Sequence, residues 1–274
     1  MKFGRHELDF GRRAFVMGIL NVTPDSFSDG GRFFDKKYAM KHARSMVDDG
    51  ADILDVGGES TRPGSEPVPV EEELKRVIPL IEKISKELDV VVSIDTYTPE
   101  VAFKAVEAGA CMLNDINGLR TRGMAEFAAS QNIPIVVMHM QGSPRNMQEN
   151  PQYGNVVDDI NLFFDERIAF ALARGVKKEN IILDPGIGFG KRLEHNLEII
   201  KRLGEFKKHG CPLLLGPSRK SFIGQILNLP AGERVEGTIA AVTASVLNGA
   251  DIVRVHDVKE SVRAVKIADA IMGR

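Results

Sequence analysis

The sequence contains only two cysteines, Cys111 and Cys211, and they lie far apart. No pair has the CxxC spacing of a cysteine zinc site, so a cysteine-bound metal is not expected. Sparse, unpaired cysteines are typical of a reducing compartment in which thiols stay free. We therefore expect a cytoplasmic protein in which both thiols are structural.

The chain also lacks a long apolar run. The longest apolar stretches, such as Ile239–Leu247, are too short to cross a bilayer. The first residues carry charges where a secretion signal needs an apolar core. Neither export nor membrane association is expected from these features.

An excess of positive charge is missing as well. The 36 Lys and Arg residues nearly balance the 38 Asp and Glu residues, giving a net charge of −2. A dedicated nucleic-acid-binding protein would need a basic excess or stripe, so the charge balance argues against this class. Small anionic substrates are still possible, because a few Arg and Lys residues in one cleft suffice to bind them.

What the chain does have is an alternation of short apolar runs with longer amphipathic segments, which predicts βα units and a parallel sheet. The expected strands are Val16–Leu20, Ile53–Val56, Val90–Ile94, Met112–Leu113, Ile135–Met138, Ile181–Leu183, Leu213–Leu215 and Ile252–Val255. The expected helices are Lys36–Asp49, Glu71–Leu88, Pro99–Ala108, Gly123–Ser130, Val156–Arg174, Leu193–Phe206, Ser221–Leu227, Glu236–Asn248 and Val258–Met272.

Eight such units in 274 residues fit one α/β domain, a single (β/α)8 TIM barrel spanning residues 1–274. The first segment, Lys2–Phe10, could form a hairpin that closes the barrel floor. The alternative is an open, doubly wound sheet. That fold predicts a Gly-rich phosphate turn after the first strand, and the sequence has none there.

Polar residues follow every expected strand. From first to eighth they are Asn21, Glu59, Asp95, Asn114 with Asp115, His139, Asp184, Ser218-Arg219-Lys220 and His256. Each has a plain structural explanation as a helix cap, a strand terminator or a satisfied hydrogen-bonding group. In TIM barrels, however, the carboxyl ends of the strands build the active site. The coincidence at all eight ends predicts one site at that face.

Eight sequence blocks, in order, resemble those of the dihydropteroate synthase family. They are Met17–Gly31, Asp55–Gly64, Ser93–Tyr97, Asn114–Gly118, Met138–Gly142, Leu183–Lys191, Ser218–Ser221 and Arg254–Val258. The resemblance implies a folate-biosynthesis transferase that condenses 6-hydroxymethyl-7,8-dihydropterin diphosphate with 4-aminobenzoate. It also implies Mg²⁺, a homodimer, competition by sulfonamides, and catalytic roles for Asp95, Lys220, Arg254 and His256.

A pterin ring presents N–H donors and a carbonyl along one edge. Carboxylate and amide oxygens suit the donors, and a cation suits the carbonyl. The resemblance places four such residues in the pterin pocket, together with two apolar residues against the ring: Asp95, Asn114, Asp184, Lys220, Met138 and Phe189. The alternative interpretation of the two apolar residues is ordinary core packing.

A diphosphate needs positive charge and directed donors. Arg254 and His256 are two residues apart on an expected strand, so they share a face and can bind phosphate oxygens together. The less favoured alternative pairs Arg254 with Asp257 or Asp251. Further diphosphate contacts are expected from Thr61 and Arg62.

The resemblance also assigns a metal ligand and an acceptor pocket. Asn21 carries an amide oxygen, a hard ligand that suits Mg²⁺, and would hold the ion against the diphosphate. The residues expected around 4-aminobenzoate are Phe27, Arg62, Pro63, Lys220 and Ser221. The loops after the first two strands would close over the diphosphate, which predicts that the pterin diphosphate binds first.

Two further segments attract attention. The Gly-rich Gly186–Lys191 lacks the spacing of a Walker A motif, so we interpret it as a tight turn behind Asp184 that exposes Phe189. The segment His139–Tyr153 has no helical or strand period. Long loops in compact domains are usually functional, although a mere connector is the alternative.

Three rival functions are weighed against the synthase. A methyltetrahydrofolate–corrinoid methyltransferase would share the pterin carboxylates, but it has no use for the cationic groups at residues 218–221, 254 and 256. A pterin-binding barrel without catalysis would not need Asn21, Asp95, Lys220 and Arg254 intact. A sugar-phosphate aldolase or isomerase would want a Schiff-base Lys on a strand, whereas Lys220 follows one.

Overall fold

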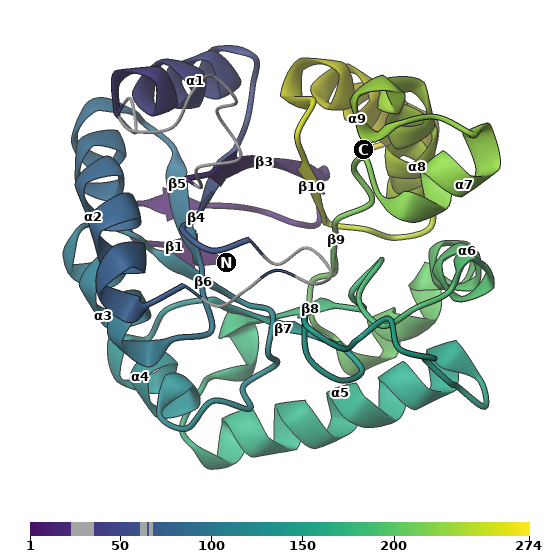
Figure 1. Cartoon of the computed structure of the whole chain (residues 1–274), viewed down its shortest axis with the longest axis horizontal. Helices are drawn as coiled ribbons and strands as arrows, with labels where there is room; N and C mark the ends of the chain where they lie inside the picture. The colour runs from purple at the N-terminus through teal and green to yellow at the C-terminus, as the bar shows by residue number, and fades with distance from the viewer. Residues whose placement is uncertain (23–35, 61–64, 66–67) are drawn as a thin grey trace.

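The computed structural model describes residues 1–22, 36–60, 65 and 68–274. Within them, eight parallel strands form one sheet in the order β8-β7-β6-β5-β4-β3-β10-β9. A parallel bridge between Leu183 at β8 and Leu213, just before β9, joins the two ends of this sheet. The sheet therefore closes into a (β/α)8 barrel, as predicted, and the open doubly wound alternative is excluded. Figure 1 shows the strands as an inner ring surrounded by helices.

The barrel strands all contain the predicted segments or most of them. They are β3 (Phe15–Asn21), β4 (Ile53–Gly57), β5 (Val91–Asp95), β6 (Met112–Asp115), β7 (Ile135–Met138), β8 (Ile181–Asp184), β9 (Leu214–Leu215) and β10 (Ile252–Val255). Several strands run one or two residues past their predicted ends. Asp95, Asn114 and Asp184 therefore belong to strands β5, β6 and β8, and the backbone ladder fixes where their side chains point.

The α-helices that follow the strands also agree closely with the predicted segments. They are α1 (Lys36–Asp48), α2 (Val70–Glu87), α3 (Pro99–Glu107), α4 (Met124–Gln131), α5 (Val156–Ala173), α6 (Leu193–Lys201), α7 (Ser221–Leu227), α8 (Val235–Leu247) and α9 (Val258–Met272). The helix predicted over Leu193–Phe206 is wrong in its second half. It breaks after α6 into the 3-10 helix η3 (Leu203–His209), which contains Gly204, a poor helix former.

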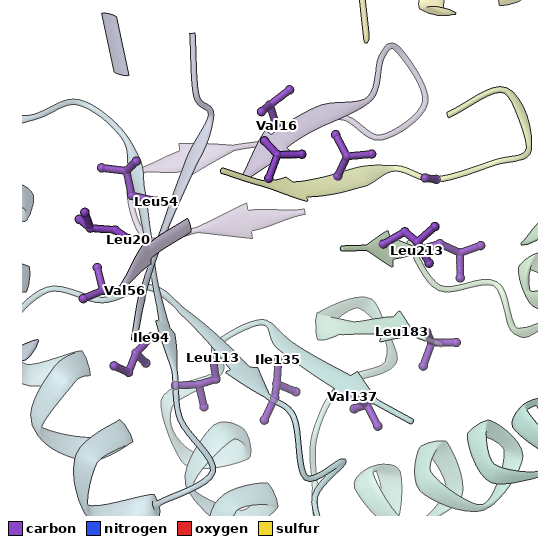
Figure 2. Packing of buried hydrophobic residues seen from close by; sticks show 14 of the residues in the cluster. Val16, Leu20, Leu54, Val56, Ile94, Leu113, Ile135, Val137, Leu183 and Leu213 are labelled. Atoms are coloured by element: carbon purple, nitrogen blue, oxygen red, sulfur yellow. The ribbon is translucent and has the colours of Figure 1, made fainter. Parts of the chain in front are cut away.

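The strand alternation sorts side chains into an outer and an inner set. Outward residues such as Leu54, Leu113 and Val137 pack against the surrounding helices, as Figure 2 shows. Inward residues at the amino ends of the strands, including Ile53 and Met112, form a second apolar cluster. Since successive residues face opposite sides of a strand, the next inward positions lie closer to the carboxyl ends.

The floor of the barrel is closed by an N-terminal hairpin, as predicted. Strands β1 (Lys2–Phe3) and β2 (His6–Glu7) pair antiparallel. Phe3 is fully buried and joins the inner apolar cluster together with Leu8. The amino end of the barrel is thereby filled with apolar side chains, and the polar inward residues are left at the opposite end. Among the described residues, no helix is both long and apolar enough to cross a membrane.

Candidate functional site

Four polar side chains meet inside the carboxyl end of the barrel. Arg254 on β10 donates from Nε to Asp55 Oδ2 at 2.6 Å and from Nη2 to Asp95 Oδ2 at 2.7 Å. Asn114 on β6 donates from Nδ2 to the same Asp55 oxygen at 2.8 Å. The barrel thus brings together three predicted site residues, Asp95, Asn114 and Arg254, around Asp55, which the sequence analysis did not single out.

This network is buried, and burial sets its charge states. Burial raises the pKa of Asp95 to about 7; the charges of Asp55 and Glu73 add to this rise, and those of Arg254 and Lys220 oppose it. Burial lowers the pKa of Arg254, but Asp55 and Asp95 outweigh it and raise that pKa overall. The guanidinium therefore stays cationic. The Oδ1 atoms of Asp55 and Asp95 have no hydrogen-bond partner among the described residues, so the site holds spare acceptors.

Asp184 and Lys220 lie within electrostatic range of this network. Burial raises the pKa of Asp184 to about 6, opposed by a backbone hydrogen bond and by the cations Lys191, Lys220 and Arg254. Its Oδ1 accepts from Gly186 N at 2.7 Å, so the structural alternative for Asp184, a local strand-ending bond, also holds. Asp184 therefore interacts electrostatically with both Lys220 and Arg254.

An apolar wall adjoins these charges. Met138 and Phe189 belong to one small cluster with Ile116, Met140 and Met147. The prediction that the Gly-rich turn exposes Phe189 is wrong, because its ring is only 9% exposed. The turn itself is present, with positive φ at three glycines, but it folds the ring inward, where Lys220 Nζ lies 4.2 Å from the ring centroid. A flat heterocycle could pack on this wall.

Asn21, the predicted metal ligand, ends β3 beside the same cluster. A Cβ atom built on Gly57 would lie 3.4 Å from Asn21 Oδ1 and 3.5 Å from Asp95 Cβ, so both residues border this glycine. No cluster of three His, Cys, Asp or Glu side chains suited to a metal occurs in the described part of the chain. Any cation here would need most of its ligands from substrate and water, a coordination that suits Mg²⁺.

His256 follows β10 rather than lying within it, because the strand ends at Val255. Its Nδ1 is 3.0 Å from Ser218 Oγ, and burial, with Arg254 and Arg219 adding to it, lowers the pKa of His256 to about 3. The imidazole is therefore neutral near pH 7 and can offer an N–H donor but no charge. Asp257 pairs instead with Arg219 at the rim, which excludes it as the partner of Arg254.

The residues predicted to form the acceptor pocket lie only partly within the described chain. Of the residues predicted around 4-aminobenzoate and the diphosphate, Phe27, Thr61, Arg62 and Pro63 lie outside the described residues. Ser221 is the first residue of α7 and lines a polar pocket of about 390 Å³. Other residues of this pocket include Gln148, Asn150, Lys191 and Gln225. Gln148 and Asn150 come from the irregular segment after β7, which therefore lies beside the predicted site.

Comparison with known proteins gives the family. Residues 17–256 match the family described as pterin binding enzyme. A dihydropteroate synthase of Clostridium beijerinckii is 52% identical over 276 residues, covering 100% of both chains. The chain belongs to the dihydropteroate synthase family. It is accordingly a transferase with a role in folate biosynthesis.

Solved structures of dihydropteroate synthases share the architecture. The Yersinia pestis enzyme in a sulfonamide drug complex superposes with a TM-score of 0.96 at 45% identity, covering 100% of this chain and 99% of that one. The Xanthomonas albilineans enzyme with 4-aminobenzoic acid gives a TM-score of 0.90 at 42% identity, covering 96% and 94%. Barrel and hairpin are thus those of a dihydropteroate synthase.

Lys191, a buried lysine near this apolar wall, was not among the predicted site residues, and burial lowers its pKa to about 7. Lys191 is 3% exposed, and its Nζ lies 2.9 Å from Phe189 O, 3.3 Å from His139 O and 3.1 Å from His139 Nδ1. It ties the turn after β8 to the segment after β7. The sequence offered one signal for this residue. Lys191 is the last residue of the Gly-rich segment and of the family-like block Leu183–Lys191.

Replacing Lys191 by Met is expected to cost about 2–4 kcal/mol of unfolding free energy, because two buried carbonyls lose their donor. Pterin binding should weaken as well, since Phe189 sits in the released turn. Denaturant unfolding and calorimetric titration with a pterin measure the two effects. The exposed Lys201 on α6 provides the control, and its Met variant should change neither. An unaltered unfolding free energy in Lys191→Met would contradict this role.

A second buried group lies behind the site on α2. Glu73 is 1% exposed, and burial raises its pKa from 4.5 to about 7, opposed by a hydrogen bond from Thr96. Because the folded chain keeps this proton above the pH at which the unfolded chain releases it, Glu73 stabilises the fold at low pH. That contribution is lost as the pH rises through about 7.

Glu73→Gln should therefore gain stability relative to the original chain as the pH rises from 5 to 8, by roughly 2–3 kcal/mol across this window. Thermal or denaturant unfolding at several pH values measures the gain. Glu71→Gln, on the same turn but exposed, is the matched control and should show a difference that does not vary with pH. If the difference in unfolding free energy did not vary with pH for either variant, Glu73 would be ionised over the whole pH range.

Proposed function

We propose that this chain catalyses the condensation of 6-hydroxymethyl-7,8-dihydropterin diphosphate with 4-aminobenzoate, giving 7,8-dihydropteroate and diphosphate. The observation that carries the proposal is the joining of Asp55, Asp95, Asn114 and Arg254 in one buried network beside Asp184 and Lys220. Such a cluster offers acceptors for a pterin edge and a cation for a phosphorylated arm. The 4-aminobenzoic acid and the sulfonamide bound by the two related enzymes support the nature of the second substrate.

Some residues of the cluster would bind the pterin ring, and others would bind the diphosphate. Asp95, Asn114 and Asp184 accept hydrogen bonds from the ring N–H groups, Lys220 donates to its carbonyl, and Met138 with Phe189 packs on the ring face. Arg254 donates to the diphosphate, and neutral His256 can add an N–H group. A protein site that fixes donors before reaction needs no reorganisation as charge develops.

The substitution would proceed by a dissociative path. The bond between the exocyclic methylene carbon and the diphosphate oxygen breaks, and its electron pair leaves with the diphosphate beside Arg254. The carbon becomes cationic, and the Asp95 carboxylate near the ring favours that cation. The arylamine nitrogen then bonds to the carbon and loses a proton to solvent. Closure of the loops after β3 and β4 would exclude water from the cation.

Asn21 would hold Mg²⁺ in this site. The amide oxygen of Asn21 beside Asp95 is a hard ligand that suits this ion. When bound, the ion supplies Lewis-acid stabilisation of the leaving group. Removing it with a chelator should lower turnover by at least about tenfold, and Mg²⁺ should restore it. Full turnover in excess chelator would contradict this assignment.

The experiment that tests the function mixes both substrates and follows pyrophosphate by a coupled assay and dihydropteroate by chromatography. We expect both products in equal amounts and none when either substrate is omitted. A sulfonamide should compete with 4-aminobenzoate. Pterin binding without pyrophosphate release would favour a methyltransferase-like or non-catalytic pterin-binding barrel instead.

We further propose that the pterin diphosphate binds first and that the working unit is a homodimer. Ordered binding is the expectation of the sequence analysis, and most of the residues after β3 and β4 on which it depends lie outside the described residues. Calorimetry should then show no tight 4-aminobenzoate binding to the free protein.

Analytical ultracentrifugation should give twice the chain mass, and a monomer that is fully active at every concentration would contradict the dimer.

A further inference from the structure

Asp55 is an acid in the middle of a buried strand, one inward position deeper than the strand-end residues. It is fully buried, and in the sheet register it lies opposite Ser93, whereas Asp95 lies opposite Gly57. An ionisable side chain at such a depth is rare unless it is paired. Its Oδ2 atom has two donors, Arg254 Nε and Asn114 Nδ2.

Arg254 is held by two carboxylates at different depths. Nε is bonded to the deep Asp55, and Nη2 to the shallower Asp95, whose side chain is 6% exposed. A guanidinium as largely enclosed as that of Arg254, whose side chain is 19% exposed, needs a counter-ion in every state that the protein visits. If a ligand engaged Asp95, Asp55 would remain the hydrogen-bonded carboxylate partner of Arg254.

Asp55 also fixes the orientation of the Asn114 amide. Because Nδ2 donates to a carboxylate, the amide nitrogen must face Asp55, and the carbonyl oxygen faces the other way as an acceptor. A single carboxylate oxygen therefore sets the direction of two predicted substrate contacts, Arg254 and Asn114. Asp55 Oδ1 and Asp95 Oδ1 lack hydrogen-bond partners in the described chain. In a purely structural network, buried carboxylate oxygens would normally all accept hydrogen bonds.

We propose that Asp55 is a positioning residue: it is the permanent anchor of Arg254 and Asn114, whereas Asp95 is the partner that Arg254 gives up when substrate binds. This inference rests on the proposed function. On binding, the Asp95 carboxylate turns to the pterin ring, and Nη2 of Arg254 is released toward the diphosphate. Nε stays on Asp55, so the guanidinium pivots about a fixed point without losing its counter-ion.

The test compares Asp55→Asn, which keeps the shape and removes the charge, with Ser93→Ala as the matched control. Ser93 is a fully buried neighbour in the same layer, and its Oγ has no hydrogen-bond partner in the described chain. Calorimetry measures binding of 6-hydroxymethylpterin and of its diphosphate, and steady-state assays give kcat and the KM for each substrate. We expect Asp55→Asn to bind the diphosphate about 10–100-fold more weakly and the ring alone only severalfold more weakly. The KM for the arylamine substrate should stay the same, and Ser93→Ala should resemble the original chain.

A double-mutant cycle separates positioning from general damage. In an Arg254→Met background, Asp55→Asn should have little further effect on diphosphate binding, because its action passes through Arg254. Equal losses in both backgrounds, or an Asp55→Asn variant that behaves like Ser93→Ala, would overturn the proposal. Should Asp55→Asn not fold, Asp55→Glu keeps the charge, displaces it by one methylene, and should show the same selective loss for the diphosphate.

A wrong role for Asp55 and a wrong enzymatic function would give different results. If the chain is not a synthase of this kind, the original protein itself neither binds the pterin diphosphate nor releases pyrophosphate. If only the role of Asp55 is wrong, the original chain is active and Asp55→Asn keeps its affinity for the diphosphate.

Discussion

Replacing Arg254 by Met should lower kcat about 10²–10³-fold, the range expected when one preorganised donor to a developing negative charge is removed. The same change should cost about 3–5 kcal/mol of unfolding free energy, because breaking a buried pair leaves uncompensated charge behind. Both carboxylates bonded to Arg254, those of Asp55 and Asp95, are almost fully inaccessible to solvent. Steady-state kinetics and denaturant unfolding measure the two effects.

Arg13 offers the matched control at the opposite end of the barrel. It forms a two-bond pair with Asp52, but its side chain is 49% exposed. Arg13→Met should therefore change the unfolding free energy by at most about 1 kcal/mol and leave kcat unchanged. If Arg254→Met retained normal turnover, the leaving group would not depend on this guanidinium, and the proposed division of work would fail.

Asp95→Asn is expected to lower kcat by about 10²-fold, because an amide cannot stabilise the cationic carbon electrostatically. In the free protein, burial raises the pKa of Asp95 to about 7. Since the ionised carboxylate is the active form, kcat/KM for the pterin diphosphate should fall as the pH drops below about 7. The Asn variant should lose this acidic limb, which a pH series of initial rates would show.

Asp115 allows the electrostatic effect to be separated from simple loss of a buried acid. It ends the neighbouring strand β6, is fully buried, and accepts hydrogen bonds from the backbone of Asn117 and Leu119 at 2.8 Å each. Asp115→Asn should reduce stability and leave kcat near normal. Equal kcat losses in the two variants would mean that Asp95 matters only for folding.

The ring of strands could be predicted because each strand is a short apolar run and each helix is longer and amphipathic. The position of the site followed from topology, since parallel strands present all their carboxyl ends at one face. Topology alone placed Asp95, Asn114, Asp184 and Arg254 at strand ends, and the family resemblance assigned the first three to a pterin pocket. Approximate strand boundaries were enough to locate the site, because the barrel brings the carboxyl ends of all its strands together.

Contacts across the barrel could not be predicted in the same way. Arg254 and its deep partner Asp55 are 199 residues apart, and which acid meets the guanidinium depends on strand register. The pairing of Arg219 with Asp257 and the inward position of Phe189 depend on turn geometry after β9 and β8. The local hydrophobic pattern carries no information about which residues far apart in the sequence come into contact. A buried acid inside the apolar strand Ile53–Gly57 was nevertheless a signal, because isolated charges rarely occupy barrel interiors.

The most direct test of the account is a crystal structure of this chain with 6-hydroxymethylpterin diphosphate and Mg²⁺. We expect the ring to lie against Met138 and Phe189 with its N–H edge on Asp95, Asn114 and Asp184. The diphosphate should contact Arg254, and Asn21 should be a ligand of the ion. A ligand bound elsewhere, or one whose phosphates avoid Arg254, would contradict the central claim that this barrel end binds both parts of the substrate.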